Sequence, residues 1–504
     1  MSRTRSFLVD AGSNYLRMLA TIVGTVFLTR AMALHWGIDD FGRWSFIMSV
    51  LGFGLLLDLG LSNVVLKAAG GTDQKAASEI LSSVFVGFLV VSTAAGVILA
   101  GVLWWMLPNS ASGVLWAIVV LSVRATVATL PWTVFRSALY ARGRMSIANA
   151  MQGVGALLYS AAACWVLHLG GGIAGVAWVS LAFTVSDSVV LVAMVRRYLP
   201  DIRLRAEFRY QSLRPSLSLG GASLLINVAG LILLKTDPII VKSFLPIAQV
   251  AIYAVALRIA ENIFLLCKQL VNALTPHAIK AGADGEIDLL ARLFQRATRY
   301  VLAFGTSLYI AAVMLGRDAI RLWLSPEYEP SAAILNILLL AMVLSIPQLV
   351  GSNLMTFSGR HKTVAAFVGF GAALNVLASI VLVQFLGTSG VAYGTLVTTI
   401  LIDVLFVIPF SCKHFGVSSW RFLGEIVWAV AVPGACQFVL LVIARNQFRA
   451  ATLLGVVVQA VLSAAVFAGV FSVIGVTAEE RRSLAAALGP KRITAPEPWP
   501  NEAV

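Results

Sequence analysis

Charged residues are scarce in this chain. Only 12% of its 504 residues are Asp, Glu, Lys or Arg, whereas 59% are hydrophobic, and the mean hydropathy is +0.90. The sequence also lacks a polar stretch long enough for a soluble domain of ordinary size. Soluble proteins of this length do not have such a composition. It therefore excludes a soluble fold and predicts an all-α polytopic membrane protein.

Cysteine and histidine are scarce too, and the common catalytic motifs are missing. The chain has 4 cysteines, none in Cys-x-x-Cys spacing, and 5 histidines, so we expect neither a disulfide nor a metal site. It contains no His-Glu-x-x-His, Walker A or Gly-x-Ser-x-Gly motif. We therefore expect a protein that is not an enzyme and that binds no cofactor.

The lysines and arginines that the chain does have lie mostly between its apolar segments. The net charge is +14, which in a soluble protein would indicate nucleic acid. In a membrane protein the same excess orients the spans and lies near anionic head groups, so we expect membrane lipids and no nucleic acid as partners. The N-terminal MSRTRSFLVD leads into an apolar segment without a cleavage site, which predicts a retained span.

Apolar segments long enough to cross a bilayer recur along the whole chain. With the N-terminus inside, the inner segments collect 25 of the 37 lysines and arginines and the outer segments collect 7. This bias predicts that both termini are cytoplasmic. We predict about fourteen transmembrane helices, at 12–33, 42–66, 80–107, 113–136, 146–168, 173–195, 216–243, 248–275, 298–315, 331–355, 363–386, 390–411, 424–444 and 451–475.

The two halves of the chain repeat each other. Pro131 in the first half is matched by Pro347 in the second, and Gly143–Arg144 is matched by Gly359–Arg360 at the same offset. GIAGVAW at 172–178 is matched by GTSGVAY at 387–393, at nearly that offset. Each copy contains six spans, an even number, so both copies cross the membrane in the same direction. A duplication kept only for packing would leave the same trace.

The repeat divides the chain into four parts. We predict two six-helix lobes, over 1–210 and 211–412, related by a pseudo-two-fold axis along the membrane normal. The first lobe ends in the basic loop RRYLPDIRLRAEFRYQSLR. Two further spans follow over 413–476, and a cytoplasmic tail, partly disordered, over 477–504.

Several charged residues fall within the predicted spans. Each costs on the order of 3 kcal/mol at the bilayer centre, so each is a candidate for function. The cations predicted to line a substrate cavity are Arg17, Arg124, Arg258 and Lys235. The acids that either pair with them or carry a coupling proton or sodium ion are Asp58, Asp187, Asp237, Glu261 and Asp403.

Each of these residues also has a structural interpretation. Arg258 and Glu261 lie three apart, on one helix face, where they can neutralise each other. Lys235 and Asp237 fall near the end of a span, where a charged group reaches the interface. The other acids can join neighbouring helices by hydrogen bonds.

A diffuse pattern of motifs suggests a family. The predicted second span contains FGRWS and LDLGL, and the seventh and eighth contain TDPII followed by YAVALR. These motifs lie in the stretches 39–70 and 235–261; two further stretches, 138–150 and 315–340, fit the same pattern. Over about residues 10–412 the sequence resembles the polysaccharide transporter branch, which includes O-antigen-type flippases, of the multidrug/oligosaccharidyl-lipid/polysaccharide (MOP) flippase superfamily.

This resemblance implies a MATE-like fold with a V-shaped cavity between the lobes, opening alternately to each side. It implies a flippase that moves an undecaprenyl-diphosphate-linked oligosaccharide from the cytoplasmic to the outer leaflet of the bacterial inner membrane. Its partners would be this substrate, membrane lipids and polysaccharide assembly enzymes. A diphosphate has about two negative charges, and arginine binds phosphate oxygens bidentately, so a cationic cavity is expected.

Two other functions stay open. A drug or organic-cation antiporter of the same fold would favour a net acidic cavity. A membrane polysaccharide polymerase or ligase would normally present a sizeable outer loop, whereas the longest outer loop predicted here is only about 316–330.

Overall fold

Every regular element in the described part of the chain is a helix, which confirms the predicted all-α fold class. The computed structural model describes residues 3–58, 60–71, 73–108, 110–201, 208–209, 221–447, 450–477 and 480–482. These residues do not include the predicted boundary at 210/211, most of the basic loop or most of the tail.

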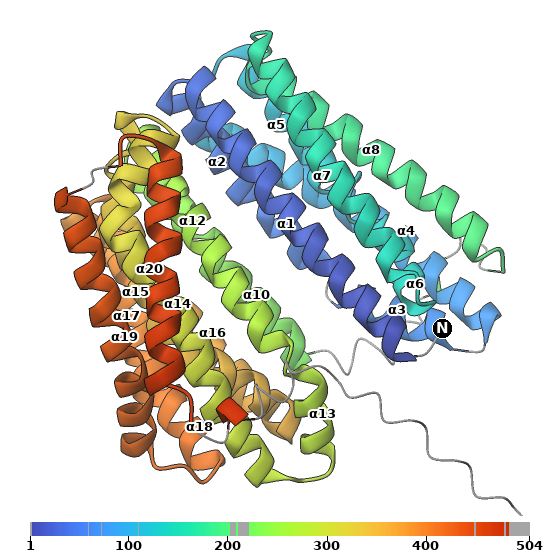
Figure 1. Cartoon of the computed structure of the whole chain (residues 1–504). Coiled ribbons are helices and arrows are strands. Elements are labelled where there is room, and N and C mark those ends of the chain that lie inside the picture. The colour runs from blue at the N-terminus through green and yellow to red at the C-terminus, as the bar shows by residue number, and fades with distance from the viewer. Residues whose placement is uncertain are drawn as a thin grey trace, which may run out of the picture.

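The helices form two lobes, which lie side by side in Figure 1. The N-lobe consists of α1 (Arg3–His35), α2 (Ile38–Gly52), η1 (Phe53–Asp58), α3 (Leu61–Gly70), α4 (Gln74–Met106), α5 (Ser112–Ala125), α6 (Thr133–Ala141), α7 (Met145–His168) and α8 (Gly172–Tyr198). The C-lobe begins with α10 (Gly221–Lys235), α11 (Asp237–Phe244), α12 (Ile247–Asn272), α13 (Thr275–Ala283), α14 (Ile287–Trp323) and η2 (Pro326–Tyr328). It continues with α15 (Ser331–Met355), η3 (Thr356–Arg360), α16 (His361–Leu386), α17 (Thr388–Thr398), η4 (Thr399–Val407) and α18 (Ile408–His414). Two last helices, α19 (Ser419–Gln447) and α20 (Leu453–Ile474), pack on α14.

Eleven helical stretches of the described residues are long and apolar enough to cross a membrane, judged by length and composition. The predicted count of about fourteen is therefore not confirmed. Two divided spans and one pair of spans joined across a kink explain the difference. The predicted spans 331–355 and 363–386 lie in one stretch, Ser331–Leu386. The predicted span 113–136 is divided into α5 and α6, and 216–243 into α10 and α11.

Turns of the same geometry recur in the two lobes, at the places where the sequence repeats. Gly143 and Gly359 both have positive φ, +68° and +84°, and each precedes a long helix, α7 or α16. Gly172 and Gly387, the first residues of the matched GIAGVAW and GTSGVAY segments, have φ of +56° and +59°. A side chain would be strained at such φ values, so glycine is required there in both copies.

The lobes meet at one end of the molecule and separate at the other (Figure 1). One hydrophobic core contains residues of both lobes, including Phe41 and Val50 of α2 with Val250 and Tyr253 of α12. Two further cores each belong to one side: one joins α3, α4, α6, α7 and α8, and the other joins the C-lobe to α19 and α20. We call the end with the shared core the closed end and the opposite one the open end.

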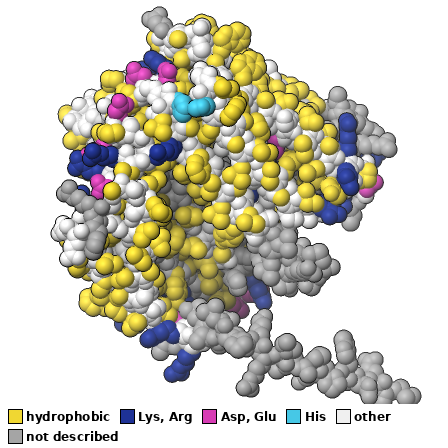
Figure 2. All heavy atoms as spheres, turned by 45° about the horizontal axis from the view of Figure 1, so that its top comes forward, with side chains coloured by type: hydrophobic (Ala, Val, Ile, Leu, Met, Phe, Trp, Pro, Cys, Tyr) yellow, Lys and Arg dark blue, Asp and Glu magenta, His cyan; other side chains and the backbone are white. Residues whose placement is uncertain are grey.

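Contacts across the closed end are close. A Cβ added at Gly42 of α2 would lie 2.3 Å from the carbonyl oxygen of Ile247, where α12 begins. Arg30 of α1 donates to the carbonyl oxygens of Leu322, at 3.2 Å, and Trp323, the last residues of α14. Both contacts join the N-lobe to the C-lobe. Figure 2 shows hydrophobic side chains over much of one face and a hollow between its two halves.

Candidate substrate site between the lobes

A cluster of charged side chains lies where α10 and α12 face the N-lobe. Nζ of Lys235 donates to Oε1 of Glu261 at 3.1 Å. The Lys235 stem packs on α2, because a Cβ added at Gly52 would lie 3.2 Å from its Cγ and Cδ. The side chains of Lys235 and Glu261 remain 28% and 30% exposed. The ion pair is thus accessible, although each partner lies within or beside a long apolar helix.

Arg258 lies one turn before Glu261 on α12 and reaches across to the N-lobe. Its Nη1 donates to Oγ1 of Thr29 on α1 at 3.3 Å. Glu261 acts on Arg258 electrostatically, but the ion pair of that carboxylate is with Lys235. No carboxylate of the described residues forms an ion pair with Arg258. The sequence interpretation of Arg258 and Glu261 as a mutually neutralised pair therefore does not describe the observed geometry.

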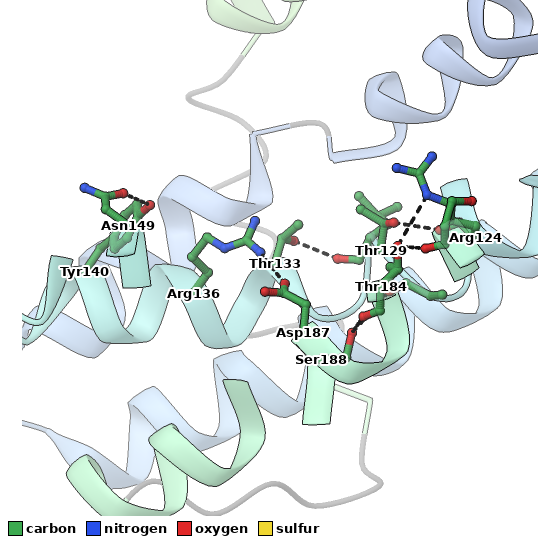
Figure 3. Close-up of polar contacts among 12 residues, drawn as sticks. Arg124, Thr129, Thr133, Arg136, Tyr140, Asn149, Thr184, Asp187 and Ser188 are labelled. Atoms are coloured by element: carbon green, nitrogen blue, oxygen red, sulfur yellow. Dashed lines mark hydrogen bonds and ion pairs between the residues drawn. The ribbon is translucent and has the colours of Figure 1, made fainter. Parts of the chain in front are cut away.

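Arg124 contributes a cation from the N-lobe. It lies in the last turn of α5, where the negative end of the helix dipole favours a positive charge. Its Nε donates to Oγ1 of Thr184 on α8 at 3.3 Å (Figure 3). Tyr159 of α7 experiences the charge of both Arg124 and Arg258, which places the two arginines near one tyrosine. With Lys235 the cluster holds three cations, and its acids are Glu261 and Asp237, which interact electrostatically with each other.

The chain unwinds directly after Arg124, between α5 and α6. The hydroxyl of Thr129 donates to the carbonyl oxygen of Arg124 at 2.6 Å, and that of Ser188 donates to Ala128 at 3.3 Å. Thr126 donates to Ser122 in the same way, at 2.7 Å. The Thr129 and Ser188 hydroxyls satisfy carbonyl groups that the break removes from the helix, whereas the Ser122 carbonyl also keeps its backbone donor, the Thr126 N–H at 3.1 Å. Such side-chain donors are how membrane helices tolerate breaks.

Arg17 is not brought into this cluster. It lies three turns before Thr29 on α1, which corresponds to about 18 Å along a helix. Its Nη2 donates to Asn14 at 2.8 Å, and its backbone packs closely on Gly153 of α7. The buried Nε has no hydrogen-bond partner among the described residues. Arg17 therefore lies nearer the open end of the molecule, beside α7.

Besides Glu261, which pairs with Lys235, three more of the five candidate acids are held by hydrogen bonds or ion pairs. Asp58 accepts from the backbone N–H and the hydroxyl of Ser62, at 3.0 and 2.8 Å, and so caps α3. Asp187 pairs with Arg136 of α6 at 3.0 Å (Figure 3). Asp237 is buried and accepts from the Tyr253 hydroxyl at 2.5 Å. These contacts resemble the structural interpretation of acids that join neighbouring helices.

Asp403 differs from its repeat counterpart Asp187. It lies in η4, a π-helical segment, whereas Asp187 lies in the regular α8. The side chain of Asp403 has no ion pair among the described residues. Since Arg136 pairs with Asp187, the counterpart of Arg136 in the second copy would be expected to pair with Asp403. That counterpart is Ser352, which has no charge.

Comparison with known proteins identifies the family. A model of the family described as "Polysaccharide biosynthesis protein" matches residues 37–333, more than half of the chain. The chain belongs to this family. No curated protein matches the chain.

The fold of this chain is similar to the folds of MOP superfamily transporters. It is similar to the lipid II flippase MurJ in an inward closed conformation, with a TM-score of 0.71 and 14% identity over 91% of this chain and 98% of that one. It is also similar to a multidrug resistance MATE transporter of the MOP superfamily. That structure, in an inward-facing conformation, gives a TM-score of 0.66 and 14% identity over 80% of this chain and 98% of that one. A multidrug resistance MATE transporter in an outward-facing conformation gives a TM-score of 0.57 and 14% identity over 81% of this chain and 96% of that one. The predicted resemblance to this superfamily is thus confirmed.

Sequence reasoning missed several members of the site. Thr29 and Thr184 bind the two arginines, but threonine is too common in membrane helices to be singled out. Arg136 falls at the inner edge of a predicted span, yet it pairs with Asp187 of a different helix. Only the three-dimensional packing of the lobes brings these side chains to the site.

Proposed function

We propose that this protein is a flippase that moves an undecaprenyl-diphosphate-linked oligosaccharide from the cytoplasmic to the outer leaflet for surface polysaccharide biosynthesis. In this proposal the open end faces the cytoplasm of the bacterial inner membrane, with both termini on that side. The diphosphate binds between the lobes, and the lobes then reverse their closed and open ends. Polysaccharide assembly enzymes would supply and consume the cargo.

The three cations Lys235, Arg258 and Arg124 support this proposal. Carrying a diphosphate, with a charge of about −2, past the apolar interior requires cationic groups that replace its hydration. The three cations come from both lobes, so a single anion can contact the two sides of the cavity. The same side chains would repel an organic cation, which disfavours the antiporter alternative.

The basic residues near the open end support the orientation. Arg142 and Arg144 follow α6, and Arg196 and Arg197 lie in the last turn of α8. Lys280 lies in the last turn of α13 on the other lobe. Basic residues of this kind gather on the cytoplasmic side of membrane proteins.

Substitution of the two cavity arginines tests the proposal. Arg124→Ala and Arg258→Ala, each beside the Lys variant, are expressed in a host that lacks the transporter and tested for surface polymer. Loss of one charge-assisted contact of about 1.5–3 kcal/mol weakens cargo binding about ten- to hundredfold. We expect less polymer, lipid-linked units retained inside, and partial rescue by lysine.

The control is Arg321→Ala, an exposed arginine at the closed end of α14. Membrane protein levels are measured for every variant. Normal polymer from both cavity alanine variants would overturn the proposal. Unchanged polymer with an altered resistance to cationic drugs would instead favour the antiporter.

A further inference from the structure

A second basic site lies outside the space between the lobes, at the start of α14. Arg292, Arg296 and Arg299 are four and three residues apart, so they form one stripe along this helix. They line a cavity of about 330 Å³ together with Glu425 of α19 and Glu480, which follows α20. None of these residues takes part in the proposed flippase site.

Glu480 holds two of the arginines in place. Its carboxylate, 7% exposed, accepts from Nη2 of Arg299 at 2.6 Å and pairs with Nε of Arg296 at 3.2 Å. It also accepts from the Thr477 N–H at 3.0 Å, while its own N–H donates to the Thr477 hydroxyl at 3.3 Å. This reciprocal capping arrangement orients the carboxylate, and with it the two guanidinium groups.

The arginines have charge and hydrogen-bond donors that no described residue pairs with. Arg292 is exposed and has no ion pair among the described residues. Nε of Arg299 is buried and lacks a described hydrogen-bond partner, and the Arg296 side chain is 50% exposed. The three arginines and two glutamates leave a net charge of +1, which matches a phosphodiester rather than a dianionic phosphate.

The position and the floor of the cavity favour a membrane lipid. The 37 residues of α14 extend about 55 Å, much longer than the hydrocarbon core of about 30 Å, so its first turns lie at head-group depth. Buried Phe422 and Ile426 of α19 line the cavity beside the arginines. An apolar wall below a cationic rim suits an amphiphile with an anionic head.

We propose that this cavity binds the phosphodiester head group of an anionic glycerophospholipid, with Arg292 and Arg296 as its contacts and Glu480 as the group that positions Arg296 and Arg299. The site is separate from the cargo site, because it lies on the outside of the C-lobe, between α14 and α19.

The full-length protein in nanodiscs of phosphatidylcholine with a minor fraction of phosphatidylglycerol provides the test. Native mass spectrometry measures the phosphatidylglycerol retained per protein. We expect Arg292→Gln and Arg296→Gln each to weaken retention about tenfold, the effect of one charge-assisted contact. Both arginines are exposed, so these variants should fold. Arg321→Gln, on the same helix at its other end, is the matched control and should retain lipid normally.

Other outcomes would overturn the proposal. Equal retention by wild type, Arg292→Gln and Arg296→Gln would show that the arginines bind no lipid. An equal loss in Arg321→Gln would show an unspecific effect of net charge. Inorganic phosphate and the deacylated head group, glycerophosphoglycerol, are added as competitors; if either displaces the lipid at comparable concentration, the site recognises a soluble phosphate and the lipid assignment is wrong.

Discussion

Gly42 is the place where a single methyl group should separate the lobes. It lies on α2 of the N-lobe, and a Cβ there would lie 2.3 Å from the carbonyl oxygen and 3.1 Å from the carbonyl carbon of Ile247. An ordinary contact begins at 3.4 Å, so the two backbones must move apart by about 1 Å. Neither partner atom belongs to a flexible side chain that can turn away.

The cost falls on one conformation only. Overpacking of this kind costs about 1–3 kcal/mol. If alternating access opens the closed end, Gly42 and Ile247 separate in the other state and the clash disappears there. Gly42→Ala should therefore shift the equilibrium toward that state by about five- to 150-fold.

The shift can be measured as a distance across the closed end. Spin labels are placed at Asp39 and Glu327, which are exposed and lie on opposite lobes, in a background without the native cysteines. Double electron–electron resonance should show a longer distance population in Gly42→Ala. Gly37→Ala is the control, because a Cβ at Gly37 has no neighbour within 4 Å. Identical distance distributions in both variants and the parent would refute the reasoning.

Two further predictions concern stability. Burial raises the pKa of Glu480, but the Thr477 N–H and the Arg299 and Arg296 guanidinium groups lower it more, so its pKa lies below the ordinary carboxyl value. The ionised Glu480 therefore stabilises the folded protein above the pKa of a glutamate in the unfolded chain, about 4.3. This stabilisation is lost as the pH falls through the lower pKa that Glu480 has in the folded protein. Glu480→Gln should lower the melting temperature at pH 7, by a difference that shrinks in acid; a difference that grows in acid would contradict this. Gly143→Ala and Gly359→Ala, at positive φ, should each cost about 1–2 kcal/mol in a denaturation experiment. Gly155→Ala, in a regular helix with open space around it, should be neutral or stabilising.

The internal repeat made much of the fold predictable. Gly143 and Gly359, which match in the repeat, share a left-handed conformation in the structure. The positions of the helix breaks were harder to predict from the sequence. Pro131 and Pro347 occupy matching sequence positions, but the chain unwinds only before Pro131, whereas α15 continues through Pro347. Proline removes a donor in both places, and the hydroxyls that compensate for a break depend on neighbouring helices.

The candidate site was predictable in its residue types but not in its pairings. A charge within an apolar span is visible in the sequence, which is why Lys235, Arg258 and Glu261 stand out there. Spacing along one helix favoured an Arg258–Glu261 pair, but Glu261 binds Lys235 from a different helix. Periodicity describes one helix at a time, and the choice of partner depends on how α10 and α12 pack.

The placement of the cations has a consequence for transport under the proposed function. Arg124 belongs to the N-lobe, whereas Lys235 and Arg258 belong to the C-lobe, so their mutual repulsion acts across the cavity. A bound diphosphate replaces that repulsion with attraction to both sides. A ligand shifts a conformational equilibrium only by its difference in affinity for the two states. The cargo can therefore favour movement of the lobes because its phosphates contact both of them, and a cluster confined to one lobe would bind the same anion without that effect.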